Sequence, residues 1–280
     1  MRQFDLNTEK IICEKYNQEG MTISFLAQNY HCRTEAIKNV LLKYNIPIKR
    51  KGLSKNRLLK EDYFENIDSE EKAYFLGLFF TDGSIVPDSD GKRFPSITIS
   101  LKISDIDILE KFRTEINMHS KLTYDKRENK ECAVLRFRSQ KMANDLAKYG
   151  IIPQKTYKTK HLPNNIPSNF IIPFMRGLLD GDGSIYQQKD KSYKIDFCSY
   201  HKSICEDFRN LCNQFLDEPV TTVIENYGTA YHFKINKKHL VKQLATVLYK
   251  DSKISLARKY EKASVLFEDN NEEDIVYSDH

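Results

Sequence analysis

The chain of 280 residues contains no tryptophan, and none of its six cysteines forms a CxxC pair. The missing CxxC pairs argue against a zinc ribbon and against a redox dithiol. No apolar run approaches the roughly 20 residues that cross a bilayer, and no basic flank precedes an apolar segment near the N-terminus. We therefore expect a cytoplasmic chain without signal or transmembrane segments, whose cysteines are reduced.

Charge is unevenly distributed along a chain of otherwise ordinary composition. Apolar residues make up 40% and charged residues 30%, which is typical of a globular protein, and the length suggests about two domains. Residues 1–60 hold 12 Lys/Arg and 5 Asp/Glu, a net charge of +7. This excess predicts a polyanionic partner, although a solvated surface would also explain it. Residues 268–280 hold six acids and are expected to be an acidic tail.

Three short segments of helical periodicity occupy the N-terminal region. The third, from about residue 33 to residue 44, carries Ile37, Val40 and Leu41 on one face, and only about four residues separate it from the second. So short a connection is expected of a helix-turn-helix. The stretch SFLAQNYHCRTEAIKNVLLKYNI resembles helix-turn-helix domains of phage and bacterial mobile-element proteins. Residues 1–52 are therefore predicted to form a small all-α helix-turn-helix domain, and residues 53–61 a basic linker.

This resemblance implies that the third helix enters the major groove of DNA. Residues off the apolar face at its start are expected to read bases, and the basic run after it is expected to hold phosphates. The predicted contacts are Arg33, Thr34, Lys38, Lys49, Arg50 and Lys51. The alternative is a three-helix packing module that does not touch DNA.

An internal repeat with an offset of 100 residues is the most informative feature of the sequence. FLGLFFTDGSI (75–85) and FMRGLLDGDGSI (174–185) align on Gly-Leu and on Asp-Gly-Ser-Ile. Each copy is followed by a matching series of strand and helix patterns, which in the second copy include a strand at about 220–225. The sequence therefore predicts an α+β fold of two pseudo-symmetric αββαββα repeats, at 62–165 and 166–267, followed by the acidic tail at 268–280.

The repeated motif contains residues that are unfavourable in an ordinary helix. Gly77 and Gly177 fall in mid-helix, where Gly costs about 0.5–1 kcal/mol relative to Ala, so we expect the two motif helices to approach each other closely there. Gly83 and Gly183 follow the helices and are expected as left-handed caps.

Asp82 and Asp182 fall at the C-terminal ends of these helices, where the helix dipole is already negative. Two such helices side by side would bring the acids together, and a divalent cation would relieve their repulsion. Carboxylates and helix-terminal carbonyls are hard oxygen ligands suited to Mg²⁺. The predicted metal ligands are Asp82, Asp182, Thr81 and Gly181. No His or Cys cluster lies near the acids, so zinc chemistry is not expected.

The two motifs resemble those of the LAGLIDADG endonuclease family. MRGLLDGDG is a close match, whereas FLGLFFTDG is looser because Phe80 replaces the acid at the sixth motif position. The metal-binding acid of the family is the eighth motif residue, which corresponds here to Asp82 and Asp182. The resemblance covers about residues 62–265.

The resemblance implies a site-specific double-strand DNA endonuclease of the homing type. Two or three Mg²⁺ or Mn²⁺ ions would act at each active-site pair, and each half would cut one strand across the minor groove to leave 3′ overhangs. Two motifs in one chain imply a pseudo-symmetric monomer that reads a long, asymmetric duplex site. The implied context is a bacterial, phage or organellar mobile element.

The family also places a lysine or glutamine near each active site. In the segment before the second motif, Lys160 is the first candidate and Lys155 the second. In the corresponding segment of the second repeat, the candidates are Lys253 and then Lys250. Lys102, at the end of a strand that runs toward the first motif, is a further candidate. Each of these is alternatively an ordinary surface lysine.

The strands are expected to form a saddle that lies along the DNA. Alternation places polar side chains on one face of the sheet in both repeats, which is the arrangement that major-groove readout needs. A merely solvated sheet face would show the same alternation. The predicted DNA contacts are Thr98, Ser100, Arg136, Arg138, Lys194, His232, Lys234 and Asn236.

Two other functions remain open from the sequence. The saddle could grip intron RNA in a group I intron maturase or another RNA-binding protein, or the chain could be a DNA-binding regulator that has lost cleavage. The two retained acids argue against the regulator, because without metal they only destabilise the fold. They do not argue against the maturase, since one chain can do both.

Overall fold

A computed structural model of the chain describes residues 4–17, 21, 23–46, 48, 58–89, 93–125 and 131–268. The described residues fall into two compact units, one within residues 1–60 and 113–121 and the other within residues 61–112 and 122–280. Three predicted phosphate contacts, Lys49, Arg50 and Lys51, lie outside the described residues, as does the acidic tail beyond Glu268.

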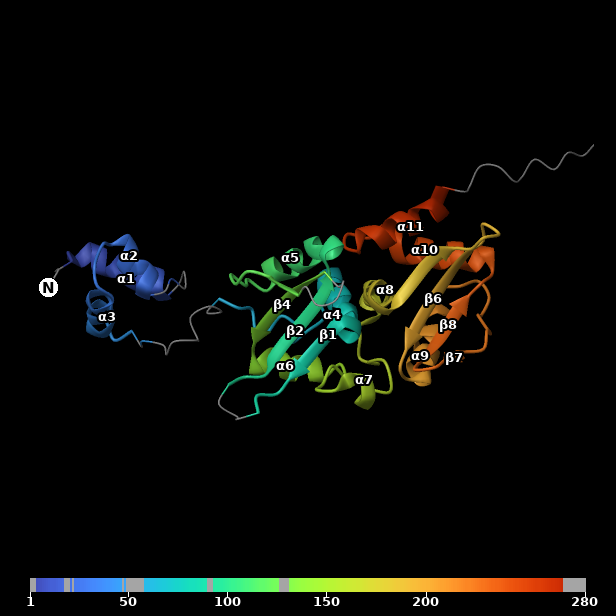
Figure 1. Cartoon of the computed structure of the whole chain (residues 1–280), viewed down its shortest axis with the longest axis horizontal. Coiled ribbons are helices and arrows are strands. Elements are labelled where there is room, and N and C mark those ends of the chain that lie inside the picture. Colours follow the sequence, from blue (N-terminus) through green and yellow to red (C-terminus); the bar gives the residue numbers. More distant parts are fainter. Residues whose placement is uncertain are drawn as a thin grey trace, which may run out of the picture. The chain divides into compact units, whose positions relative to one another are not determined.

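Three helices form the N-terminal part of the first unit (Figure 1). They are α1 (Leu6–Asn17), α2 (Ile23–Asn29) and α3 (Thr34–Lys43). Apolar residues that recur at helical spacing form their common core, in which Ile12, Leu26, Ile37 and Leu41 are fully buried. The three segments of helical periodicity therefore form helices. A role of these helices in DNA binding stays a prediction.

In the second unit, the described strands form two four-stranded antiparallel sheets, one in each repeat. Sheet A has the order β1-β2-β4-β3 and sheet B the order β5-β6-β8-β7. The strands are β1 (Gly83–Val86), β2 (Ser96–Lys102), β3 (Thr123–Asp125), β4 (Cys132–Arg138), β5 (Gly183–Gln187), β6 (Tyr193–Ser199), β7 (Glu225–Tyr227) and β8 (Ala230–Ile235). The predicted α+β class with two matching repeats is confirmed.

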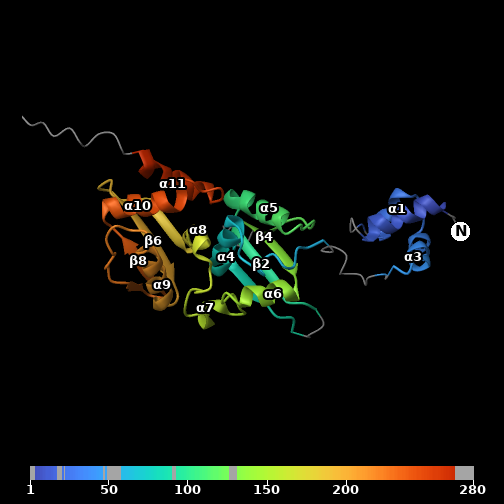
Figure 2. The same ribbon diagram turned by 180° about the vertical axis from the view of Figure 1, so that it is seen from behind.

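Helices cover one face of each sheet (Figures 1 and 2). In sheet B, the ring of Phe208 stacks on Phe197 of β6 at a centroid distance of 4.2 Å; in sheet A, Phe112 lies 6.4 Å from Phe137 of β4. The alternating apolar residues of the strands therefore face the helices, and the polar set faces away from them. The covering helices are α5 (Ile106–Glu115), α6 (Gln140–Ala147), α9 (Lys202–Cys212) and α10 (Lys238–Tyr249).

Two further helices, α7 (Lys155–Lys158) and α11 (Ala257–Glu268), complete the second unit together with the 3₁₀ turns Ile103–Asp105 and Ser168–Phe170. The sequence pattern predicts neither α7 nor α11. It also places the third strand of the second repeat at 220–225, five residues before its start in the structure. None of the described helices has the length and apolar character needed to span a membrane.

The motif helices α4 (Glu70–Asp82) and α8 (Ile171–Asp182) lie side by side between the two sheets (Figures 1 and 2). A Cβ atom on Gly77 would overlap the carbonyl oxygen of Phe174, and one on Gly177 would overlap that of Tyr74. The backbones therefore touch where the sequence predicts close approach, and only glycine fits at these two positions.

The prediction that Gly83 and Gly183 are left-handed caps is wrong. Gly83 has φ −79° and ψ 153°, and Gly183 has φ −104° and ψ 174°, so both are extended and begin strands β1 and β5. A Cβ atom at either position would collide with Phe79 or Leu179 in the last turn of the preceding helix. Glycine is needed here because the chain passes directly from helix to strand, not because φ is positive.

Candidate active site at the ends of the paired helices

Asp82 and Asp182 end α4 and α8, and the packing of these helices brings the two ends together. Gly181 lies directly against the end of α4, because a Cβ atom there would come within 2.6 Å of Asp82 Oδ2 and would overlap Thr81. The absence of a side chain at 181 therefore allows the first acid to lie against the backbone that carries the second. The predicted proximity of the two motif ends is present in the structure.

The two carboxylates both have raised pKa values, with Asp82 half-buried and Asp182 more exposed. Burial raises the pKa of Asp182 to about 6, the charge of Asp82 adds to this increase, and Lys155 and Lys259 oppose it. Burial also raises the pKa of Asp82, against a hydrogen bond from Thr81 and the charge of Lys155. One side of Asp182 still faces solvent. The acids are thus accessible from outside, yet their joint ionisation is unfavourable.

Lys155 is the predicted lysine that reaches the acids. At the start of α7, its Nζ donates a hydrogen bond to the carbonyl oxygen of Thr81 at 2.7 Å. Burial lowers the pKa of Lys155, and the charges of Asp182 and Asp82 raise it. The Thr81 carbonyl, one of the predicted metal ligands, is thus bound by an ammonium group.

Lys259 occupies the corresponding place in the second repeat. Its side chain is 4% exposed, and its Nζ donates to the carbonyls of Leu179, at 3.4 Å, and Gly183 at the end of α8. Burial lowers the pKa of Lys259 to about 8, with a contribution from Arg258. Each motif helix thus ends at a lysine that binds its terminal carbonyls and offsets the negative end of the dipole.

The sequence does not indicate Lys259, because α11, the helix that carries it, is not predicted. The structure places the other lysine candidates elsewhere. Lys253 approaches Glu70 at 4.0 Å, in the first turn of α4 and at the opposite end of that helix from Asp82. Lys160, Lys102 and Lys250 are exposed, and within the described residues none of them bonds to either acid. Proximity to a motif in the sequence does not show which lysine turns inward.

Asp180, at the sixth motif position of the second repeat, is buried and stabilises the packing of the helices through hydrogen bonds. Its buried carboxylate accepts hydrogen bonds from the hydroxyls of Tyr74 at 2.8 Å and Tyr249 at 2.7 Å, and from the backbone N–H of Leu256 at 2.7 Å. Tyr74 belongs to α4, so this bond joins the two repeats. Phe80 occupies the matching position of the first repeat, and its replacement of an acid therefore removes no group from the Asp82–Asp182 pair.

A pocket opens beside the acids. It is lined from both repeats, by residues that include Phe80, Thr81, Lys155, Asp182, Ser199 and Tyr200. One acid and one lysine therefore face the same space, together with hydroxyl groups that can bind an anionic ligand.

The donors at the acid pair suit a hard divalent cation. Among the described residues, no group of three or more His, Cys, Asp and Glu side chains gathers at one point. A cation would therefore be held by the carboxylates of Asp82 and Asp182, by a backbone oxygen such as that of Gly181, and by water. This oxygen-only set with few carboxylates is the one that Mg²⁺ accepts, because Mg²⁺ keeps several of its waters.

In sheet A, the predicted DNA contacts lie on the face opposite the helices. Arg136 Nε donates to Thr98 Oγ1 at 3.3 Å, and Arg138 donates to the carbonyl of Phe94 at 2.6 Å. Both arginines are exposed, and Ser100 follows Thr98 on the same face. This face therefore presents hydrogen-bond donors and positive charge.

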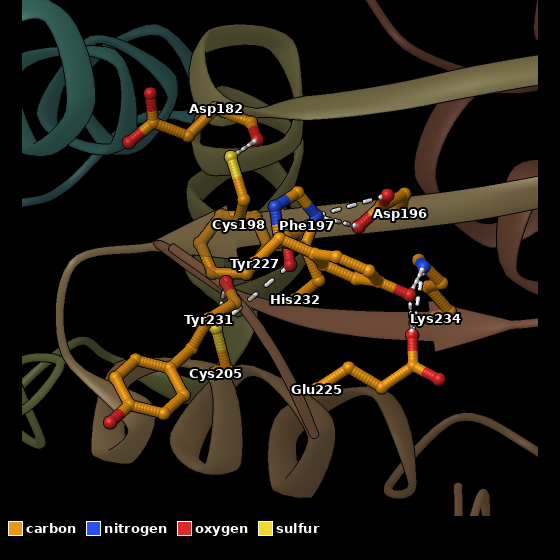
Figure 3. A network of polar contacts seen from close by, with 10 residues as sticks. All are labelled: Asp182, Asp196, Phe197, Cys198, Cys205, Glu225, Tyr227, Tyr231, His232 and Lys234. Carbon is orange, nitrogen blue, oxygen red and sulfur yellow. Dashed lines mark hydrogen bonds and ion pairs between the residues drawn. The ribbon is translucent and has the colours of Figure 1, made fainter. Parts of the chain in front are cut away.

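In sheet B, the predicted contacts are joined in a network (Figure 3). His232 contacts Asp196, and Lys234 contacts Glu225 and Tyr227. Cys198, which lies opposite His232 in the sheet, donates separately to the backbone carbonyl of Asp182 at 3.1 Å. Lys194 pairs with Tyr186 in the same sheet, and Asn236 is exposed just beyond β8.

The described N-terminal contacts lie at the start of α3. Arg33 is exposed and precedes the helix, Thr34 is its first residue, and Lys38 forms an ion pair with Glu35 at 2.9 Å. These residues lie off the buried face of Ile37, Val40 and Leu41, as the sequence predicts.

The second repeat matches a known family. Residues 169–248 match the model of the LAGLIDADG-like domain. This region runs from the turn before α8 to α10 and contains Asp182. Residues 169–248 are therefore similar to a LAGLIDADG-like domain, as the second motif indicates. No curated protein matches the chain.

Solved structures of similar fold include two endonucleases with DNA and one further protein. I-AabMI bound to uncleaved DNA has 12% identity and a TM-score of 0.46, over 69% of this chain and 87% of that one. I-GzeII in complex with its DNA target has 20% identity and a TM-score of 0.46, over 69% and 88%. Full-length DUF199/WhiA from Thermatoga maritima has 14% identity and a TM-score of 0.46, over 74% and 63%.

Proposed function

We propose that the protein is a site-specific, divalent-metal-dependent double-strand DNA endonuclease of the homing type. The observation that carries this proposal is the placement of Asp82 and Asp182 at the adjoining ends of α4 and α8, with the pKa of Asp182 raised by burial and by the other acid. A fold gains no stability from such a pair, whereas a metal-dependent hydrolase requires it.

The residues of the chain would divide the work of phosphodiester hydrolysis. Asp82 and Asp182 would hold Mg²⁺ or Mn²⁺, with two or three ions at each active-site pair, and Gly181 would add its carbonyl. Bound metal would polarise the scissile phosphate and lower the pKa of a coordinated water. Lys155 and Lys259 would stabilise negative charge on the phosphate from the two sides of the site.

The open faces of the sheets would bind the duplex. Sheet A offers exposed arginines to phosphates and guanine, and sheet B offers the His232 and Lys234 network. The N-terminal helices would extend the footprint through Arg33, Thr34, Lys38 and the basic run at 49–51. Because equivalent positions of the two sheets carry different side chains, such as Thr98 in sheet A and Asp196 in sheet B, a single chain acting as a monomer would read an asymmetric site.

The proposal is tested by selecting and then cutting DNA. Duplexes that bind the protein are enriched from a random-sequence library in EDTA, and the enriched duplex is then incubated with the protein in Mg²⁺. We expect one cut in each strand at a fixed position, no cut in EDTA, and recovery when Mn²⁺ replaces Mg²⁺.

Other outcomes would identify other functions. Specific binding of the duplex without any cut in Mg²⁺ or Mn²⁺ would contradict the nuclease and leave a DNA-binding regulator of the same fold. Tight binding of structured intron RNA without enrichment of any duplex would favour an RNA-binding maturase.

A further inference from the structure

The two sheets carry different chemistry at equivalent positions of their open faces. Both sheets use the same register, so the place of Thr98 in sheet A is taken by Asp196 in sheet B, and that of Val134 by His232. A hydroxyl and an alkyl group in the first repeat are thus replaced by a carboxylate and an imidazole in the second.

Asp196 and His232 form a side-chain pair across strands β6 and β8 (Figure 3). The Nδ1 atom of His232 lies 2.9 Å from Asp196 Oδ1 and 3.1 Å from Oδ2. Because a carboxylate only accepts hydrogen bonds, Nδ1 must carry a proton. In the neutral ring, Nε2 then has no proton and is a hydrogen-bond acceptor.

The surroundings of the pair hold the ring of His232 in place. Tyr227 meets it edge to face at a centroid distance of 5.1 Å. Lys234, the nearest cation along β8, is bound by Glu225 and by the Tyr227 hydroxyl, each at 2.8 Å, and lies 4.2 Å from the Tyr227 ring. Since Glu225 binds Lys234, Asp196 remains available to His232. The side chain of His232 is still 23% exposed on the open face of the sheet.

We propose that Asp196 is a positioning residue that fixes the tautomer of His232, so that Nε2 accepts a hydrogen bond from the amino group of an adenine or cytosine in the major groove. The proposal rests on the proposed binding of duplex DNA by this face. Adenine N6 and cytosine N4 are the donors that bases present in the major groove, whereas guanine presents only acceptors there. The equivalent Val134 of sheet A has no group for this discrimination.

The first experiment compares base preferences by selection from a random duplex library in EDTA, with wild-type protein and with Asp196→Asn. An amide both donates and accepts, so it permits either tautomer of His232. We expect wild type to prefer adenine or cytosine over guanine about fivefold or more at one position, and Asp196→Asn to reduce this ratio to below about twofold there. The matched control is Glu218→Gln, which alters a carboxylate–histidine pair with His239 (2.8 Å) at the start of α10; it should leave every position unchanged.

The second experiment needs no variant. Wild-type selections at about pH 8 and about pH 5.5 are compared, because protonated His donates from both ring nitrogens and would favour guanine at the same position. The titratable or charged groups facing His232 are Asp196, Cys198, Glu225, Tyr227 and Lys234. The shift toward guanine should be smaller in Asp196→Asn, because at high pH this variant already accepts guanine as well as adenine or cytosine.

The outcomes separate this inference from the proposed function. An unchanged preference in Asp196→Asn, or identical wild-type preferences at the two pH values, would overturn the inference. Failure of cleavage with intact base selection would overturn only the nuclease activity. Failure of wild type to select any duplex would overturn both. Should Asp196→Asn not fold, the comparison of wild type at the two pH values decides.

Discussion

Each acid of the candidate site is accompanied by a lysine that also binds the end of a helix. Lys155 binds the Thr81 carbonyl, and Lys259 binds the Leu179 and Gly183 carbonyls. The lysines therefore contribute twice, because they offset the dipoles of α4 and α8 and lower the repulsion between the carboxylates. Replacing either lysine should therefore slow phosphodiester hydrolysis and increase the repulsion between the carboxylates of Asp82 and Asp182.

Lys155→Met should slow DNA cleavage by about 10- to 100-fold, because the phosphate loses a nearby positive charge in a site of low solvation. Binding of the selected duplex in EDTA should change by less than about threefold, since one contact among many is lost. Single-turnover cleavage and a filter-binding titration would measure the two effects. Lys158→Met, an exposed position in the same helix, is the matched control, and equal slowing by both variants would contradict the assigned role of Lys155.

The charge of Asp182 should make the protein less stable at neutral pH than at acidic pH. Because its pKa is raised to about 6 in the folded protein, the native state binds a proton that the unfolded chain releases between the ordinary carboxyl pKa and about pH 6. Its contribution to the free energy of unfolding therefore falls as pH rises through this window and then stays low.

Asp182→Asn should accordingly stabilise the protein at pH 7.5 by about 1 kcal/mol. This is less than the full shift would give, because the carboxylate is partly exposed. The gain should vanish near pH 4, where the wild-type acid is protonated. Urea unfolding at both pH values measures this, with surface Asp217→Asn as the control. A loss of stability at pH 7.5 would contradict the repulsive environment of Asp182.

At the scale of single residues, the sequence predicts the functional positions that occur in both copies of the repeat. It does not predict contacts that depend on how the elements pack. The acids and the mid-helix glycines occur twice at one offset, so their shared role is visible. Lys155 and Lys160 are the same residue type and are close in sequence, and nothing in their spacing shows that only Lys155 turns toward Thr81. Asp196 lies in an outward position of its strand, as Lys194 and Cys198 do, and its pairing with His232 depends on the register between β6 and β8.

At the scale of elements, the contact between α4 and α8 sets the geometry of the site. The two backbones touch at Gly77 and Gly177, and Asp180 accepts a hydrogen bond from Tyr74 across the same interface. A helix pair fixed at two places along its length holds its ends at a defined separation. The acids at those ends are therefore positioned by the helices and not by loops.

Gly177→Ala should destabilise the protein by about 2–4 kcal/mol, because the added Cβ would overlap the Tyr74 carbonyl and force the helices apart. Cleavage measured at a temperature where the variant is still folded should also fall, since the acids would separate. Asn144→Ala on the exposed face of α6 should change stability by less than about 0.5 kcal/mol. Wild-type stability of Gly177→Ala in thermal unfolding would contradict the close approach.

The wrong prediction at this scale concerns how the motif helices end. An Asp-Gly pair after an apolar helix is typical of a left-handed cap, but here each chain turns straight into the first strand of its sheet. A glycine at position 83 can adopt either the left-handed or the extended conformation. The pairing of β1 with β2 selects the extended one. Local pattern therefore gave the position of the helix end without its conformation.

At the scale of the whole molecule, the proposed DNA contacts are spread over the two sheets and the N-terminal helices. If the basic run at 49–51 binds phosphates, replacing Lys49, Arg50 and Lys51 by Gln together should lower the slope of log affinity against log salt by about 2–3, at roughly 0.9 per lost contact. Titrations of the selected duplex between low and moderate salt measure this slope.

Two other basic residues of the same region serve as the control for that experiment. Lys10→Gln with Lys15→Gln removes charge from α1, which the prediction leaves outside the DNA contact, and should change the slope by less than about 1. Equal slopes for wild type and the Lys49, Arg50 and Lys51 variant would exclude phosphate contacts by this run.

The most direct test of the account is double-strand cleavage of the selected duplex in Mg²⁺ by wild type, Asp82→Asn, Asp182→Asn and the double variant. If the two acids form one metal-dependent centre, wild type cuts both strands, each single variant loses double-strand cleavage, and all variants still bind the duplex in EDTA within about threefold of wild type. Cleavage of both strands by the double variant at the wild-type rate would contradict the claim that Asp82 and Asp182 carry the reaction.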